Sequence, residues 1–194
     1  MRNHLDLGCG LFPKNPFGYE NLFGIDIRSS NNKKNDATIV VANLAMESIP
    51  FPDNYFDSVS AYDFFEHVPR TAIDFSAKSS RFPFVELMDE IWRVLKPNGI
   101  LYSVTPAFPS EKAFRDPTHV NIITKKTYRY FTGPEPLGRM YGFNGNFNLI
   151  RQAWVHPRNL YKPKNSSLFE ILRDIGEKLA GEQSHLIWEF EAKK

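Results

Sequence analysis

Two glycines that follow a short apolar run near the start of the chain constrain its fold more than any other feature. Residues 4–7 (HLDL) lead directly into Gly8-Cys9-Gly10, and a second apolar run ends at Asp26-Ile27, twenty positions after Asp6. Glycines allow a sharp turn and a close approach of the backbone to a ligand, and a carboxylate at the end of the second strand can accept both hydrogen bonds of a ribose diol. The pattern predicts an open α/β sheet that binds a nucleoside at the carboxyl ends of its strands.

The third glycine of a dinucleotide-binding fingerprint is missing. A G-x-G-x-x-G motif that starts at Gly8 would need glycine at position 13, and the chain has Pro13 there. Pro13 and Pro16 also oppose a regular helix after the turn, because each removes a hydrogen-bond donor and clashes with the preceding turn. A pyrophosphate would then lack its helix N-terminus. The sequence therefore disfavours a nicotinamide-dependent enzyme.

Further motifs follow in a fixed order along the chain. They are Asn43-Leu44, 49–57 (IPFPDNYFD), 65–68 (FEHV) and 93–99 (RVLKPNG). With these motifs the chain resembles the class I S-adenosylmethionine-dependent methyltransferases, and in particular the group that carries L-D-x-G-C-G, G-x-D and L-P-F-x-D-x-x-F-D. The resemblance covers residues 4 to about 106, and residues 116–121 (DPTHVN) are similar to an uncharacterised bacterial subgroup.

The resemblance implies a Rossmann-like, doubly wound α/β fold in one domain over residues 1–194, with a seven-stranded, mostly parallel sheet and an antiparallel C-terminal strand pair. Short apolar runs bounded by Gly, Asn, Asp or Pro predict strands at 4–8, 22–27, 38–42, 57–62, 99–105, 147–155 and 186–192. The 3.6-residue periodicity predicts amphipathic helices at 84–95 and 168–180. Only three residues precede the first strand, so we expect segments 69–83 and 106–165 to cover the cofactor and bind the acceptor.

The composition limits the classes of partner. The chain has 194 residues, 24 basic and 22 acidic, and this near balance makes nucleic acid an unlikely partner. No apolar run is long enough to span a membrane and no signal peptide is recognisable, so we expect a cytoplasmic protein without a membrane anchor. Cys9 is the single cysteine, which excludes an internal disulfide and fits a reducing compartment.

The resemblance implies S-adenosylmethionine as the cofactor. Gly8, Cys9 and Gly10 would lie near its amino-acid portion, Asp26 on the ribose, and Asn43 with Leu44 at the adenine edge. The full expected set is Asp6, Gly8, Cys9, Gly10, Asp26, Ile27, Asn43, Leu44 and Tyr62. Asp6 has an alternative role in which it binds backbone groups of the turn, and Cys9 is more typical of a small residue selected for fit than of a reactive thiol.

Methyl transfer to a hydroxyl needs a group that removes the proton. His119 with Asp116 could form an oriented base pair after the fifth strand, and His67 could act as a base after the fourth. The competing interpretation is that Glu66 and His67 only shape the segment that follows them. A metal ion on Asp116 and His119 would need at least one more ligand, for which the sequence offers only Asp63 or Glu66 as guesses, so we assign no metal ligand and the sequence leaves metal dependence open.

These observations favour methyl transfer from S-adenosylmethionine to a hydroxyl of a small molecule or saccharide. One alternative is a nucleic-acid methyltransferase, although residues 61–64 (AYDF) lack the Asn/Asp-Pro-Pro-aromatic loop that amino-methylating enzymes use to grip a flipped base. A second alternative is a module that binds S-adenosylmethionine without catalysis. The sequence leaves the oligomeric state and the identity of the acceptor open.

Overall fold

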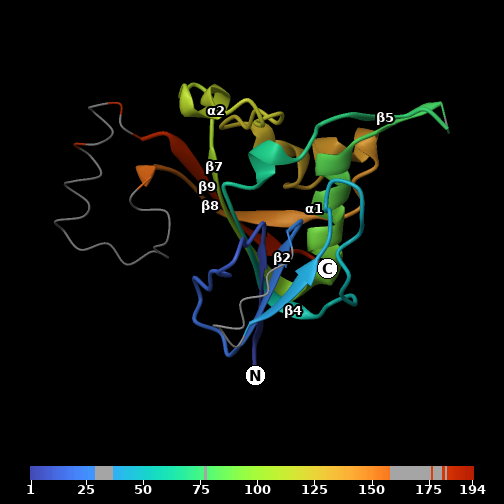
Figure 1. Ribbon diagram of the computed structural model, residues 1–194, viewed down its shortest axis with the longest axis vertical. Coiled ribbons are helices and arrows are strands. Elements are labelled where there is room, and N and C mark those ends of the chain that lie inside the picture. Colours follow the sequence, from blue (N-terminus) through green and yellow to red (C-terminus); the bar gives the residue numbers. More distant parts are fainter. Residues whose placement is uncertain (29–36, 77, 158–175, 177–180, 182) are drawn as a thin grey trace.

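A seven-stranded sheet forms the centre of the protein (Figure 1). The computed structural model describes residues 1–28, 37–76, 78–157, 176, 181 and 183–194. The sheet has the order β3-β2-β1-β4-β7-β9-β8, in which neighbours are parallel from β3 to β7 and β9 is antiparallel to both β7 and β8. Its strands are β1 (Asn3–Leu7), β2 (Asn21–Asp26), β3 (Thr38–Val41), β4 (Phe56–Tyr62), β7 (Leu95–Pro106), β8 (Phe147–Val155) and β9 (His185–Ala192). The predicted fold class is confirmed.

The predicted helix at 84–95 is present as α1 (Pro83–Val94), and its apolar side packs into the main core. Proline is tolerated at its first turn because the N–H groups there have no partner within the helix. The strand that follows was predicted at 99–105, but β7 already begins at Leu95. Asn98 adopts a left-handed φ of 62°, and the register between β4 and β7 shifts over this stretch. The turn residues therefore form an irregularity within β7 instead of its boundary.

Shorter elements connect the strands. They are η1 (Phe65–His67), β5 (Ala72–Asp74), β6 (Ser79–Arg81), α2 (Lys112–Arg115), η2 (Thr127–Tyr130) and η3 (Leu137–Tyr141). The helix predicted at 168–180 lies outside the described residues, apart from position 176. In the described part of the chain, no helix is long and apolar enough to cross a membrane.

The two faces of the sheet are packed differently. One face and α1 form the main hydrophobic core, while a smaller cluster of Tyr62, Tyr102, Val104 and Ile187 lies apart from it. Alternation along β7 places Leu101 in the first cluster and Tyr102 in the second, as expected for a strand buried on both faces.

A chain of buried polar side chains joins β1 to β4. His4 contacts Ser58 Oγ through Nδ1 at 2.7 Å and Ser60 Oγ through Nε2 at 2.9 Å. The Ser60 hydroxyl donates to Asp6 Oδ1 at 2.6 Å. Burial lowers the pKa of His4 to about 4, so its imidazole is neutral in the folded protein at pH 7. This chain links the stability of the sheet to the protonation of a buried histidine.

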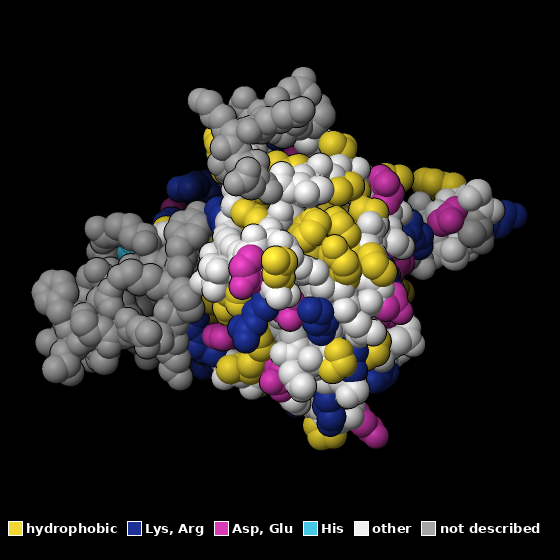
Figure 2. Space-filling model, turned by 90° about the horizontal axis from the view of Figure 1, so that it is seen from below, with side chains coloured by type: hydrophobic (Ala, Val, Ile, Leu, Met, Phe, Trp, Pro, Cys, Tyr) yellow, Lys and Arg dark blue, Asp and Glu magenta, His cyan; other side chains and the backbone are white. Residues whose placement is uncertain are grey.

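The strands β5 and β6 form an antiparallel hairpin within segment 69–83. Figures 1 and 2 show this hairpin projecting from the side of the molecule. Ile73 and Phe75 on it are 66% and 84% exposed. On the face seen in Figure 2, acidic and basic side chains are interspersed, and the described residues there form no continuous basic patch.

Candidate functional site

The loop after β1 makes the sharp turn that its glycines predict. Gly8 and Gly10 have φ values of +64° and +58°, in the left-handed region that favours glycine. A Cβ on Gly8 would lie 2.6 Å from the ring of Phe64, whereas a Cβ on Gly10 would meet nothing closer than Arg28 at 3.8 Å. Gly8 therefore permits close packing against the segment after β4, and Gly10 permits the turn.

Asp26, at the end of β2, holds this loop in place. Its Oδ2 accepts a hydrogen bond from the Gly10 backbone N–H at 2.8 Å, and its Oδ1 accepts from the backbone and Nε of Arg28, both at 3.0 Å. Burial raises the pKa of the Asp26 carboxyl, but the hydrogen bonds from Arg28 and Gly10 outweigh it and keep the pKa below its usual value. A charged carboxylate that is 6% exposed thus lies beside the glycine turn.

A pocket of about 430 Å³, which we call the Asp26 pocket, opens at the carboxyl ends of β1, β2 and β4. Five of the nine residues predicted to bind the cofactor line it. They are Gly8, Asp26, Ile27, Asn43 and Leu44. Ala42, Phe64 and Val68 add apolar surface, and its volume lies in the range of small-molecule sites.

The other four predicted residues, Asp6, Cys9, Gly10 and Tyr62, do not line the pocket in the described structure. Asp6 is fully buried, and its Oδ2 accepts from the Lys14 backbone N–H at 2.8 Å. Burial raises the pKa of Asp6 to about 6. Its hydrogen bond to the Lys14 backbone agrees with the alternative role, in which Asp6 shapes the turn. Burial likewise raises the pKa of the Cys9 thiol to about 12, so the thiol is neutral at pH 7. Tyr62 packs in the smaller hydrophobic cluster.

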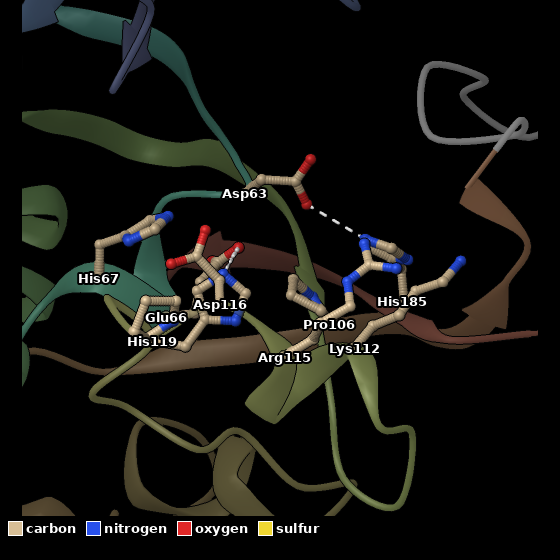
Figure 3. A pocket seen from close by; sticks show the side chains of 10 residues that line it. Asp63, Glu66, His67, Pro106, Lys112, Arg115, Asp116, His119 and His185 are labelled. Carbon is tan, nitrogen blue, oxygen red and sulfur yellow. Dashed lines mark ion pairs between the residues drawn. The ribbon is translucent and has the colours of Figure 1, made fainter.

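A second pocket of about 460 Å³, which we call the histidine pocket, shares Asp63 and His67 with the Asp26 pocket. The side chains that line it come from the segment after β4, from α2 and the loop that follows, and from the start of β9 (Figure 3). They are those of Asp63, Glu66, His67, Pro106, Lys112, Arg115, Asp116, Pro117, His119 and His185. All three residues predicted to be catalytic, His67, Asp116 and His119, therefore lie in one pocket.

The predicted pairing of His119 with Asp116 is not the one that the structure forms. Asp116 Oδ1 accepts from the backbone N–H and the hydroxyl of Thr118, at 2.8 and 2.7 Å. Thr118 Oγ1 in turn lies 3.0 Å from His67 Nδ1. The backbone turn from Asp116 to His119 points the carboxylate at Thr118, so the hydrogen bonds of Asp116 lead through Thr118 to His67 rather than to His119.

The imidazole of His119 faces a different carboxylate. Its Nδ1 lies 3.3 Å from the backbone oxygen of Ala113, and its Nε2 lies 4.0 Å from Glu66 Oε1. The rings of His67 and His119 meet edge to face, with their centroids 4.9 Å apart. Glu66, His67 and His119 consequently form one cluster (Figure 3), although His119 follows the adjacent Glu66 and His67 by more than fifty residues.

Backbone hydrogen bonds hold the loop after α2 against η1. The backbone oxygen of Glu66 accepts from the N–H groups of Val120 and Asn121, both at 2.9 Å. The Asn121 side chain, which is 1% exposed, donates to the Phe65 oxygen at 2.9 Å and accepts from Arg70 Nε at 2.8 Å. This network positions His119 beside His67.

Glu66 is the most unusual titratable group of the site. It is 1% exposed, and neither carboxylate oxygen has a hydrogen-bond partner among the described residues. Burial, with a contribution from the charges of Asp63 and Asp116, raises its pKa to about 8. The sequence offered two interpretations of the adjacent Glu66 and His67, but it did not show that Glu66 would face His119. Strongly perturbed carboxyl groups in a pocket are typical of functional sites.

The family of the chain is shown by its similarity to known proteins. Residues 5–103, more than half of the chain, match the family model described as "Methyltransferase domain". The chain belongs to this methyltransferase family. The match runs from β1 into β7 and so includes the glycine turn, Asp26 and the Glu66-His67 pair. No curated protein sequence matches the chain significantly.

Solved structures share the methyltransferase fold with this chain. An S-adenosylmethionine-dependent methyltransferase from Archaeoglobus fulgidus has a TM-score of 0.56 at 18% identity, covering 98% of this chain and 86% of that one. One from Mesorhizobium loti has a TM-score of 0.58 at 12% identity, with 98% and 90% covered. The PH0226 protein from Pyrococcus horikoshii has a TM-score of 0.59 at 15% identity, with 99% and 82% covered.

The protein is thus an S-adenosylmethionine-dependent methyltransferase, and the Asp26 pocket fits this cofactor. A carboxylate at the end of β2 can accept from ribose hydroxyls, provided that the exposed side chain of Arg28 gives way. Leu44 and Phe64 supply apolar surface of the kind that a flat base contacts. The glycine turn leaves room for ligand atoms close to the backbone.

Proposed function

We propose that this methyltransferase acts on a hydroxyl group of a small-molecule or saccharide acceptor, which binds in the histidine pocket. The observation that carries the proposal is that Asp63 and His67 line both pockets. Methyl transfer is an in-line displacement, so the acceptor oxygen must approach the cofactor from a neighbouring site. S-adenosylmethionine, bound in the Asp26 pocket, supplies an electrophilic methyl group.

The residues of the histidine pocket provide a place for the acceptor proton. The Thr118 hydroxyl has one proton, which it donates to Asp116, so it accepts from His67 Nδ1–H. His119 Nδ1–H donates to the Ala113 oxygen in the same way. Both imidazoles therefore carry a lone pair on Nε2, and these lone pairs are the groups that we propose draw the proton from the acceptor hydroxyl.

Two positively charged side chains favour a negatively charged acceptor in the histidine pocket. Lys112 and Arg115 line it, and Figure 3 shows them on the opposite side from His67 in that view. We propose that they bind a phosphate or carboxylate of the acceptor, as in a nucleotide sugar or an acidic saccharide. This preference would also orient the acceptor, because its anionic end would be held away from Glu66.

Segment 106–165 is the better supported of the two segments expected to cover the site. It contributes Pro106, Lys112, Arg115, Asp116, Pro117 and His119 to the histidine pocket. None of the described residues of 69–83 lines either of these pockets. We propose that 106–165 forms the acceptor wall.

A methyl-transfer assay with labelled S-adenosylmethionine tests this proposal. We expect turnover with nucleotide sugars or acidic saccharides, and none with DNA or RNA. Arg115→Ala should raise KM for an anionic acceptor about tenfold or more and change kcat little, because Arg115 binds the remote charged group. Arg129→Ala, on an exposed arginine of η2 that lines neither pocket, provides a matched loss of one positive charge. Cofactor binding with no turnover on any acceptor would instead favour a non-catalytic module, and methylation of nucleic acid would overturn the acceptor class.

A further inference from the structure

The cluster of Glu66, His67 and His119 has the composition of a metal site. One ligand atom from each residue lies within 4.8 Å of the other two. Three atoms that bind one metal ion at about 2.1 Å in a tetrahedral arrangement are about 3.4 Å apart. Side-chain rotations that shorten the separations by up to about 1.4 Å would therefore bring all three onto one ion.

Glu66 gives an independent reason to expect a cation here. Its carboxylate is buried at 1% exposure, and neither oxygen accepts a hydrogen bond from the described residues. The backbone N–H groups of Val120 and Asn121 donate to the backbone oxygen of Glu66 and not to its carboxyl group. A buried carboxyl group without hydrogen-bond partners is costly whether it is charged or neutral, and a bound cation would displace its proton and pair with the carboxylate.

Both histidines are prepared to act as ligands. Metal-binding histidines usually donate their second ring N–H to a backbone oxygen or to a polar side chain that fixes the ring. His119 Nδ1 does this with the Ala113 oxygen, and His67 Nδ1 does it with Thr118, which Asp116 orients. These partners leave the Nε2 lone pair on both rings.

We propose that Glu66, His67 and His119 bind one divalent transition-metal ion, such as Zn²⁺, Fe²⁺ or Mn²⁺. Two imidazoles and one carboxylate suit these ions and leave coordination positions open. All three residues line the histidine pocket, so the open positions face the place where the acceptor is proposed to bind.

The role of the ion rests on the proposed function. The acceptor hydroxyl would occupy an open position, its O–H bond would break with the electron pair left on oxygen, and its proton would pass to water in the open pocket. With the ion bound, this step replaces the direct proton transfer to the two Nε2 lone pairs, while the acceptor class and its pocket stay as proposed above. The binding of the ion does not depend on this role and can be measured without cofactor or acceptor.

Cobalt titration tests the site directly. We expect chelator-treated wild-type protein to bind one Co²⁺ per chain, with a visible absorption band from nitrogen and oxygen ligands, and Zn²⁺ to displace it. Glu66→Gln and His119→Gln should each weaken Co²⁺ binding about 100-fold or more. His185→Gln should change it by less than about threefold, since His185 lines the same pocket but pairs with Asp63 at 3.3 Å.

Three outcomes would contradict the assignment of a metal site to Glu66, His67 and His119. They are no Co²⁺ binding by the wild type, unchanged affinity in both ligand variants, and an equal loss in His185→Gln. Circular dichroism and binding of S-adenosylhomocysteine show whether each variant is folded, and if Glu66→Gln unfolds, the less buried His119→Gln decides. The role of the ion in turnover is tested separately. If chelator-treated protein still turns over, the ion has no such role, although the metal site itself would not be contradicted.

Discussion

The Gly10 backbone N–H donates a hydrogen bond of 2.8 Å to Asp26 Oδ2, which ties the loop after β1 to the end of β2. The same carboxylate accepts two bonds from Arg28 through its other oxygen. One side chain thus holds the glycine turn in shape and presents charge to the Asp26 pocket. The loop after β1 and the end of β2 are therefore fixed to each other beside the Asp26 pocket.

The two glycines of this turn should respond differently to substitution. Gly8→Ala should weaken binding of S-adenosylhomocysteine about tenfold or more, since the added methyl group collides with Phe64, which lines the pocket. Gly10→Ala meets no close neighbour and should cost about 1–2 kcal/mol of stability through its left-handed φ, with a smaller loss of affinity. Calorimetric titration and thermal unfolding measure the two effects. Equal affinity losses in the two variants would contradict this account.

The buried His4 should make stability depend on pH. Its pKa is about 4 in the folded protein, against about 6.5 in an unfolded chain, so the unfolded state binds more protons between these values. Stability is then lost as pH falls from about 6.5 towards 4. Relative to His4→Gln, the wild type should lose about 2 kcal/mol between pH 7 and pH 5 in urea unfolding.

The comparison with His4→Gln is needed because Asp6 has the opposite effect. Burial raises the pKa of Asp6 to about 6, so the folded state binds more protons than the unfolded state above pH 4. Asp6 is present in both proteins, and its bonds to Ser60 and Lys14 do not involve His4 directly, so most of its contribution cancels in the difference. A difference that does not change with pH would show that His4 is not buried as a neutral group.

Asn121 should act as a positioning residue for the histidine pocket. Asn121→Ala leaves the Phe65 oxygen without its donor and Arg70 Nε without its acceptor, although the Arg70 guanidinium keeps the Ile122 oxygen, and should lower the unfolding free energy by about 1–3 kcal/mol. It should also lower kcat more than it weakens S-adenosylhomocysteine binding, because the loop that carries His119 loosens. Asn148→Ala, on an exposed asparagine of β8, is the matched control and should stay within about 0.5 kcal/mol. A loss of cofactor affinity without a loss of kcat would contradict the positioning role.

Local sequence rules predicted most of the fold. Each strand of the main sheet lies where a short apolar run ends in turn residues, and α1 follows the 3.6-residue periodicity within one residue. The start of β7 was misplaced because Asn98 can take a left-handed conformation inside a strand, which makes a bulge look like a boundary. The antiparallel C-terminal strand pair was predicted, but the position of β9 between β7 and β8 was not, because no local pattern encodes the order of strands in a sheet.

The candidate site was predictable only where residues are close in sequence to a strand end. Gly8, Asp26 and Asn43 line one pocket because parallel strands deliver their carboxyl ends to the same edge. The pairing in the histidine pocket was not predictable, since it depends on backbone bonds between Glu66 and Val120 that no periodicity encodes. The sequence thus suggested Asp116 as the partner of His119, while the three-dimensional structure provides Glu66.

The most direct test of this account is calorimetric titration of S-adenosylhomocysteine into the wild type, Asp26→Asn and Arg28→Ala. Asp26→Asn should weaken binding about 10- to 100-fold, since hydrogen bonds to a charged group are lost. Arg28→Ala should bind as tightly as the wild type or more tightly, because the exposed guanidinium occupies the oxygen that the ribose would use. Equal affinity in the wild type and Asp26→Asn would contradict the assignment of the Asp26 pocket as the cofactor site.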